Sequence, residues 1–478
     1  MLFYIILFSL LFIILGTFIA LKFTKFKKSE KFTKVTNLIL KIAVVIYCVL
    51  VFISIFLPDS FVLCLSSDEL GNGKDQAFAI LRWFNMVNFV VLPIAVFYKN
   101  RTIRNIALSF GVIVSLVAIF YYPQFLECFT SSAGRGLNSI STLPESIKNF
   151  LINADFRSIV FLITCLLQLL IPLILYINEK HIFNFKNKKE YINYFLVLPF
   201  VILSCIPIYV PQYLFGYSNI IFSAFSTPHI LWIVGLFVVT TALYFIFKKQ
   251  DKSIKMVVLF VLALSLFMQY NEMFGAISIN LKRLPLQLCN IGAYLILLSL
   301  ICQSKRLFNF TIIINVVGVL FALAMPDLDD KGLFNLYNMH FILEHSNVLI
   351  VPVLALCFQI FPRLDRFALR DCLIGFTIYF IFVLILGTIF NSIALTTGNG
   401  FYEANYLFMF DKAEAVGMLP FLSTLFDTTI KIGSLTFYPL IQGVVYAVFI
   451  LVCLNLYMAI RLIYIIKDKI FLNSKSLA

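Results

Sequence analysis

Residues 372–394 read CLIGFTIYFIFVLILGTIFNSIA, a run of 23 residues without a charged side chain. A helix rises about 1.5 Å per residue and the hydrocarbon core of a bilayer is roughly 30 Å thick, so about 20 apolar residues cross it. Similar runs recur along the 478-residue chain, of which 62% is hydrophobic and only 13% is charged. Because these runs do not alternate apolar and polar residues, the sequence predicts an all-α polytopic membrane helix bundle rather than a β-barrel.

The charges between the apolar runs predict how the chain crosses the membrane. Lys and Arg concentrate after the odd-numbered runs, and most Asp and Glu follow the even-numbered ones. By the positive-inside rule, the N-terminus lies outside and the C-terminus lies in the cytoplasm. The first run lacks a basic segment before it, so we expect a retained span and not a signal peptide. About thirteen transmembrane helices are predicted, over residues 1–21, 37–57, 77–98, 105–126, 157–177, 192–212, 229–247, 256–276, 285–304, 307–326, 339–361, 372–394 and 434–462.

The net charge of +14 is interpreted as a consequence of this topology. Basic side chains in short cytoplasmic loops attract anionic lipid headgroups. We therefore expect membrane lipids as partners, with anionic lipid at the cytoplasmic face. No nucleic-acid partner is expected, because the basic residues are divided among many short loops.

Two segments of similar layout suggest an internal repeat. Residues 82–123 form a helix, a short basic turn and a second helix that ends at Pro123, and residues 284–326 have the same layout. Six helices separate the two copies, so both would have the same orientation in the membrane. We therefore predict a parallel 6+6 repeat. Its N-terminal half is residues 1–215, a degenerate copy with six helices, and its C-terminal half is residues 216–478, with seven.

The C-terminal half gathers polar and ionisable residues at one end of its predicted helices, near the outer leaflet. An ionisable side chain at mid-bilayer costs roughly 2.5–3.5 kcal/mol on insertion scales, so a cluster of them indicates a function. Predicted helices that enter from outside carry these residues in their first turns, and helices that leave carry them at their last residues. The candidate site residues are His229, Glu272, Gln287, Cys289, Asn290, Asp327, His340, Glu344 and His345.

Cysteine, histidine and carboxylate together are typical of a nucleophile, a general base and a group that orients the base. We assign Cys289 as the candidate nucleophile, His345 as the general base, and Glu344 and His229 as catalytic partners. At least one histidine should lie within about 4 Å of a carboxylate or of the Cys289 sulfur. Substrate binding is assigned to Gln287, Asn290, Glu272, Asp327 and His340, of which Asp327 is also a candidate orienting group.

A metal site is the rival interpretation, because histidines and carboxylates are suitable zinc ligands. His340 and Glu344 are four residues apart and share one face of a helix, whereas His345 lies well off that face. This spacing matches no helical zinc motif, so no metal is predicted. The chain also lacks the glycine motifs that bind phosphates and dinucleotides, and it specifies neither a cofactor nor an oligomeric state.

Four motifs in order resemble the YwaF-like family of bacterial integral membrane proteins: FSTPHILWIV from Phe225, LPLQLCNIGAYL from Leu284, GVLFALAMPDL from Gly318 and ILEHSNVLIVPVL from Ile342. The resemblance covers residues 225–395. It implies a relationship to a eukaryotic transmembrane acyltransferase that moves polyunsaturated acyl chains onto ether phospholipids through a Cys and a His. The second motif usually reads Leu-Pro-Leu-His-Leu-Cys in the family.

In this chain, Gln287 replaces the family histidine of that motif, and Cys289 is retained. The eukaryotic cysteine would fall at Leu286, which puts the nucleophile assignment in question. His229 and His345 match family histidines. The resemblance implies a multi-pass protein of a bacterial plasma membrane that is a lipid acyltransferase or another lipid-modifying enzyme. The residues also leave open a small-solute or proton-coupled transporter or receptor, and a non-catalytic membrane assembly protein.

Overall fold

The structure is a computed structural model in which helices form almost all of the regular structure. A short antiparallel hairpin pairs β1 (Ile430–Ile432) with β2 (Leu435–Phe437), and Ile430 lies opposite Phe437. The described residues are 2–23, 29–56, 73–123, 143–178, 187–216, 220–277, 281–324, 326, 332–418 and 420–476.

The chain divides into two compact units, and most of the first is built from segments before residue 207. In it, α2 packs against α9, and α9 packs against α6. A buried polar chain joins three of its helices, because Tyr47 of α2 donates to Gln168 of α9 (3.2 Å) and Gln168 donates to Asn85 of α4 (2.8 Å). Its elements are α1 (Leu2–Phe23), α2 (Glu30–Phe56), α4 (Gly73–Pro93), η1 (Ile94–Tyr98), α5 (Arg101–Ile106), η2 (Ala107–Gly111), α6 (Val112–Phe120), α9 (Ala154–Asn178) and α10 (Lys188–Ser204).

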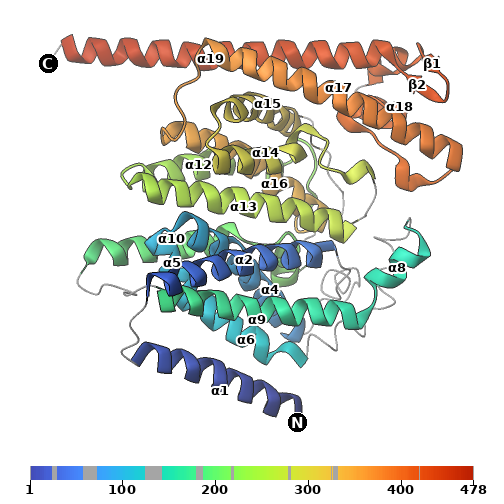
Figure 1. Cartoon of the computed structure of the whole chain (residues 1–478). Helices are drawn as coiled ribbons and strands as arrows, with labels where there is room; N and C mark the ends of the chain where they lie inside the picture. The colour runs from blue at the N-terminus through green and yellow to red at the C-terminus, as the bar shows by residue number, and fades with distance from the viewer. Residues whose placement is uncertain are drawn as a thin grey trace. The chain divides into compact units, whose positions relative to one another are not determined.

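The second unit holds the candidate site. Helix α13 packs against α14 and α16, α15 packs against α14, α16 and α17, and α19 covers α15 and α17 (Figure 1). Its helices are α8 (Glu145–Leu151), α11 (Val210–Phe215), α12 (Thr227–Phe247), α13 (Lys252–Ile277), η4 (Leu281–Arg283), α14 (Leu288–Cys302), α15 (Lys305–Ala324), α16 (Leu336–Cys357), α17 (Arg366–Thr397), η5 (Gly400–Tyr402), η6 (Tyr406–Phe408), α18 (Lys412–Met418), η7 (Pro420–Phe426) and α19 (Pro439–Ser476).

The structure corrects several predicted helix boundaries. Residues 434–437 belong to a strand and its turn, so the last long helix begins at Pro439 and not at residue 434. The predicted span 192–212 is interrupted, because α10 ends at Ser204 and the short α11 begins at Val210. Prolines at 207 and 211 remove backbone donors there, which explains the break. The helix predicted from residue 105 starts earlier, at Arg101, where the side chain of Asn100 caps it.

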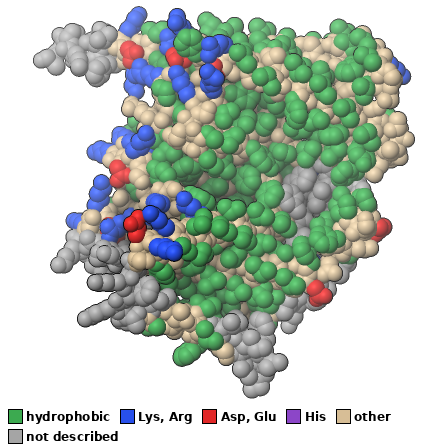
Figure 2. Space-filling view, viewed as in Figure 1, with side chains coloured by type: hydrophobic (Ala, Val, Ile, Leu, Met, Phe, Trp, Pro, Cys, Tyr) green, Lys and Arg blue, Asp and Glu red, His purple; other side chains and the backbone are tan. Residues whose placement is uncertain are grey.

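The described residues confirm an all-α polytopic membrane protein. Ten of their helices are long and apolar enough to cross a membrane, and Leu11–Ala20 and Leu288–Cys302 are shorter apolar helices. Large apolar side chains are exposed along α12, α17 and α19, as expected for surfaces that face lipid. Figure 2 shows hydrophobic side chains along much of α19. Thirteen crossings and an outside N-terminus remain predictions.

One end of the second unit carries its basic turns. Lys248, just after α12, lies over the ring of Phe245, and Lys255, in the first turn of α13, lies over the ring of Phe358. At the same end of α16, Arg363 binds Asp468 of α19 (2.9 Å), and Lys and Arg gather there in Figure 2. The candidate site residues of α12, α14 and α16 lie in the first three turns of these helices, at the ends opposite to these basic residues.

Candidate functional site

Helices α13, α14, α15 and α16 enclose a group of buried polar side chains. We call Tyr270, Cys289, Asn290, Asn315, His340 and Glu344 the polar cluster. Buried apolar side chains lie on the same helices, including Leu266, Ala293 and Val348. In such surroundings each polar atom needs a hydrogen-bond partner from the protein or from a ligand.

An ion pair in α16 forms the centre of the polar cluster. His340 Nε2 lies 2.9 Å from Glu344 Oε2, and their side chains are only 6% and 1% exposed. The spacing of four residues places both side chains on one face of the helix, as predicted from the sequence. Glu344 Oε1 and His340 Nδ1 are buried and have no hydrogen-bond partner. One atom of each side chain is therefore paired within α16, and the other can form a hydrogen bond to a ligand.

Tyr270 of α13 links this pair to α14. Its ring lies 6.0 Å from that of His340, and its hydroxyl donates to the Arg283 carbonyl (2.6 Å). The same hydroxyl accepts a long hydrogen bond from Asn290 Nδ2 (3.4 Å). The phenol thus ties α13 to the start of α14 next to the ion pair.

The Cys289 thiol lies at the contact of α14 with α15. It interacts electrostatically with Glu344, and a Cβ added to Gly318 would stand 3.2 Å from its Sγ. Glycine at position 318 therefore makes room for the thiol. The Cys289 side chain is half-buried, and Glu344 is the carboxylate whose charge acts on the thiol of this predicted nucleophile.

His345 lies beside the polar cluster and is engaged by its own helix. Its Nδ1 lies 2.7 Å from the Phe341 carbonyl, and its ring stacks 4.1 Å from the Phe341 ring. It also interacts electrostatically with Glu344 and His340. The carbonyl contact fixes the ring, which leaves Nε2 as the nitrogen that can exchange a proton.

His229 is separated from the ion pair by aromatic rings. Its Nδ1 accepts from the backbone N–H of Phe225 (3.0 Å), which holds the turn before α12. Trp232 lies 5.8 Å from the His229 ring and 5.8 Å from the Phe341 ring. The buried Nε2 faces the Leu323 carbonyl without a hydrogen bond of good geometry. These contacts give His229 a structural role at the start of α12.

Two predicted substrate-binding residues instead hold backbone segments. Gln287 Nε2 donates to the Asn405 carbonyl (2.9 Å), and Gln287 Oε1 accepts from the N–H of Leu407 (2.8 Å). Glu272 Oε2 accepts from the N–H of Ile208 (3.2 Å). Asp327 lies outside the described residues.

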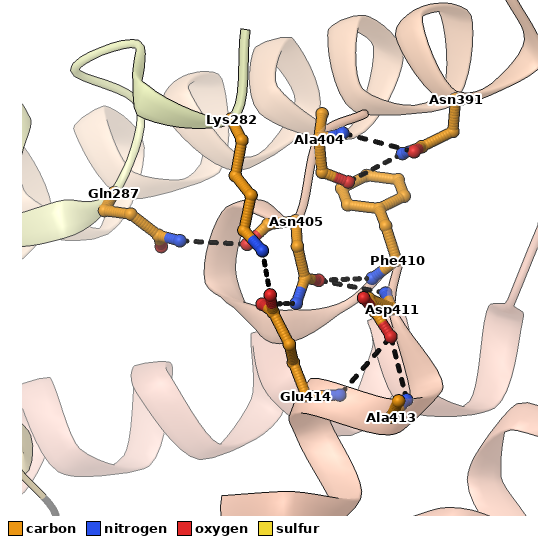
Figure 3. A network of polar contacts seen from close by, with 9 residues as sticks. All are labelled: Lys282, Gln287, Asn391, Ala404, Asn405, Phe410, Asp411, Ala413 and Glu414. Atoms are coloured by element: carbon orange, nitrogen blue, oxygen red, sulfur yellow. Dashed lines mark hydrogen bonds and ion pairs between the residues drawn. The ribbon is translucent and has the colours of Figure 1, made fainter. Parts of the chain in front are cut away.

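A polar network fastens the segment after α17 to the segment before α14 (Figure 3). Lys282 forms an ion pair with Glu414, and Asn405 donates to the other oxygen of Glu414 (2.7 Å). The Oδ1 of Asn405 accepts from the N–H groups of Phe410 and Asp411, each at 3.0 Å. Together with the bonds of Gln287, these contacts fix the position of the first turn of α14, which carries Cys289.

Sequence reasoning missed Asn315 and Tyr270. Asn315 is fully buried in the middle of α15, and neither atom of its amide has a partner. An asparagine within an apolar run is a detectable signal by itself, since a buried amide is costly without a partner. The packing of Asn315 against Gly292 of α14 depends on the rotation of both helices about their axes, and the sequence does not show this rotation.

The metal interpretation has no geometric support in the described part of the chain. No three His, Cys, Asp or Glu side chains there come close enough together to hold an ion. The polar cluster contributes one histidine, one carboxylate and one thiol, and the histidine is already paired with the carboxylate.

A comparison with protein families matches residues 224–465 to the TMEM164 family, a transmembrane family. The matched segment starts where the YwaF-like resemblance starts and continues beyond residue 395, and it includes the whole polar cluster. The YwaF-like designation itself remains a prediction. Neither a curated protein nor a solved structure matches the chain. Since the match covers just over half of the 478 residues, the chain belongs to the TMEM164 family.

Proposed function

We propose that this membrane protein is a lipid acyltransferase whose reaction takes place at the polar cluster. The observation that carries the proposal is the buried His340–Glu344 pair, in which Glu344 Oε1 lacks a hydrogen-bond partner and Glu344 interacts electrostatically with Cys289. A thiol, a carboxylate and an imidazole in this order can form and hydrolyse or transfer a thioester.

The geometry favours a different base from the one predicted. Glu344 interacts electrostatically with Cys289 and is hydrogen-bonded to His340, so the His340–Glu344 pair is placed to accept the thiol proton. His345 is adjacent in sequence and interacts with both members of the pair. We therefore assign the base to the pair and a supporting role to His345, with its Nε2 as the exchanging nitrogen.

A proton-coupled transporter is the second candidate, favoured by one observation. A buried carboxylate and imidazole in a membrane helix are typical of proton relays. The polar side chains further along the bundle argue against a continuous path, because the hydroxyls of Ser265, Ser299 and Thr311 each donate to a carbonyl of their own helix. Hydroxyls that are satisfied in this way do not pass protons along.

Two further proposals concern the membrane, the first from the family resemblance and the second from the distribution of charge. One is residence in a bacterial plasma membrane as a multi-pass protein. The other is contact of the basic turns with anionic lipid at the cytoplasmic face, which rests on the grouping of Lys248, Lys255 and Arg363 at one end of the second unit.

The test is acyl transfer by the purified full-length protein in lipid vesicles, followed with a fluorescent acyl chain moving from a phospholipid to a lysophospholipid. Cys289→Ser and Glu344→Gln should each lower the rate by at least about 100-fold, the usual range for loss of a nucleophile or general base. Cys302→Ser is the matched control, because Cys302 is exposed at the opposite end of the same helix.

Two results would contradict the proposal. One is a wild-type protein that transfers no acyl chain while it moves protons across the vesicle membrane, which would support the transporter. The other is full transfer activity in Cys289→Ser and Glu344→Gln, which would place the chemistry elsewhere.

A further inference from the structure

The centre of the polar cluster is enclosed by packed helices. The side chains of His340 and Glu344 are only 6% and 1% exposed, and α13, α14, α15 and α16 pack against one another around them. A ligand reaches such a site only when part of the protein moves. The segment between α17 and α18 is the candidate for this motion, because it is irregular and a few side-chain hydrogen bonds hold it to the start of α14.

Residues 405–411, here called the strap, lead into α18 and contain η6. Tyr406 of the strap is fully buried and donates to the Leu281 carbonyl, at the beginning of the turn that leads into α14. Tyr379 of α17 interacts electrostatically with both Tyr406 and Cys289. The strap therefore lies near the thiol, against the residues that precede it.

The backbone of the strap is strained at two adjacent residues. Leu407 has φ 56° and ψ 20°, and Phe408 has φ 56°. A residue with a Cβ is disfavoured in this left-handed region, and it keeps such a conformation only where its surroundings hold it there. The strap thus stores strain that is released when its backbone relaxes.

Bonds from the segment before α14 hold this strained turn in place. Gln287 Nε2 donates to the Asn405 carbonyl (2.9 Å), and its Oε1 accepts from the N–H of Leu407 (2.8 Å). Lys282 forms an ion pair with Glu414, whose other oxygen accepts from Asn405 (2.7 Å) (Figure 3). We call Lys282, Gln287, Tyr406 and Glu414 the latch.

The strap has one fixed end and is tied to itself. Asn391 of α17 binds the N–H and the carbonyl of Ala404, immediately before the strap, at 3.2 and 2.7 Å (Figure 3). Within the strap, Asn405 Oδ1 accepts from the N–H groups of Phe410 and Asp411, each at 3.0 Å. We therefore expect the strap to move as a unit about Ala404 when the latch is broken.

We propose that the strap is a gate for the polar cluster. The latch holds it closed over the start of α14, and the strained backbone at Leu407 and Phe408 favours its opening. Because the strain offsets part of the latch, the two states differ less in free energy than the latch bonds alone would give. Opening uncovers the residues before Cys289, at the end of the bundle opposite to the basic residues. This inference rests on the proposed function for the lipid that enters, and it concerns how the lipid reaches the thiol.

The test measures how fast N-ethylmaleimide labels Cys289 in the native full-length protein in detergent. Cys302→Ser is the background, because Cys302 is exposed and lies with Cys289 on the tryptic fragment between Arg283 and Lys305. Mass spectrometry of the digested protein gives the labelled fraction at Cys289 and at Cys357. Cys357 is exposed near the basic end of α16, so its labelling does not depend on the strap.

Labelling of a covered thiol follows the fraction of open protein. Tyr406→Phe removes one latch bond and almost no volume, so Cys289 should be labelled about five-fold faster than in the unchanged background. Gln287→Ala removes two latch bonds and should raise this rate about 20-fold. The rate at Cys357 should stay the same in both variants.

Tyr446→Phe is the matched control. The Tyr446 hydroxyl bonds that of Thr377 (2.8 Å), between α19 and α17, and takes no part in the latch. This variant should leave the labelling rate of Cys289 unchanged. If Gln287→Ala does not fold, Tyr406→Phe retains the test because it keeps the buried ring. Hydrogen exchange adds a second readout, in which the N–H of Leu407 should exchange faster in Tyr406→Phe than in the background.

Equal labelling of Cys289 in the background, Tyr406→Phe and Gln287→Ala overturns the gate. A parallel rise at Cys357 also overturns it, because the whole fold would then have loosened. The labelling needs no acyl transfer, so the two proposals fail separately. A gated thiol in a protein that transfers no acyl chain supports the gate and removes the acyltransferase, and transfer by a protein with an ungated thiol does the reverse.

Discussion

At the scale of single residues, the buried polar groups of the second unit differ in how their hydrogen bonds are used. Ser265, Ser299 and Thr311 are satisfied by carbonyls of their own helices. His340, Glu344 and Asn315 keep buried atoms without a partner. Since each such atom lowers the stability of the folded state, their grouping beside Cys289 indicates a place where a ligand supplies the missing bonds.

A pH prediction concerns Asp365, which lies just before α17. A hydrogen bond from Lys305 (2.7 Å) lowers the pKa of Asp365, and the carboxylate also caps the helix by accepting from the N–H of Phe367. Because this pKa is lower in the folded state, the pair stabilises the fold above pH of about 4 and this stabilisation is lost as the pH falls further.

Asp365→Asn keeps a capping side chain and removes the charge. Both partners are about two-fifths exposed, so solvent screening limits the expected loss at pH 7 to less than about 1 kcal/mol. Melting temperatures of wild type and variant should differ at pH 7 and converge at pH 3. A difference that stays constant over this range would show that the ion pair does not contribute.

At the scale of elements, the segment after α17 positions the start of α14. Tyr406 donates to the Leu281 carbonyl, Gln287 binds the backbone at Asn405 and Leu407, and Tyr379 donates to the Leu286 carbonyl (2.6 Å). These bonds converge on the residues immediately before Cys289. The placement of the thiol thus depends on elements more than 90 residues away in the sequence.

A glycine substitution tests how closely this segment packs on α17. A Cβ at Gly387 would stand 2.5 Å from the ring of Phe410, which cannot be relieved without moving the ring. Gly387→Ala should therefore destabilise the protein by about 1–3 kcal/mol. Gly443→Ala is the control, because nothing lies within 4 Å of that position, and it should be neutral or stabilising. Equal melting temperatures for the two variants would contradict the tight packing.

At the scale of the whole molecule, charge separation along the second unit predicts its direction in the membrane. Lys252 and Glu403 are both exposed, and they lie at opposite ends of the helices that connect them. The positive-inside rule places Lys252 in the cytoplasm and Glu403 outside.

Cysteine labelling measures this orientation. In a background with Cys64, Cys128, Cys302 and Cys357 replaced by serine, a membrane-impermeant maleimide should label Glu403→Cys in intact cells. Lys252→Cys should react only after the membrane is opened. Cys302 and Cys357 are exposed and would otherwise contribute signal, and Cys64 and Cys128 lie outside the described residues. Reaction of both introduced cysteines from outside would contradict the predicted topology.

The apolar runs alone determined the class of the protein and the approximate positions of its helices. A stretch such as residues 372–394 has no other stable conformation in a bilayer, where each backbone polar group must be satisfied within its own helix. Most predicted runs correspond to helices in the described part of the chain, although the run 192–212 is broken after Ser204. Helix ends were wrong where local chemistry intervened, as at Asn100 and at the hairpin before Pro439. The i,i+4 pair of His340 and Glu344 was also visible from spacing.

Only the tertiary structure decided which polar residues meet. Membrane helices are apolar on the side that faces lipid and on the side that faces other helices, so periodicity does not show which way Asn315 or Cys289 points. The rotation of α14 against α15 is set by the glycines at 292 and 318, and the separation of His229 from the ion pair is set by Trp232 and Phe341. These contacts join residues far apart in sequence, and so no local pattern encodes them.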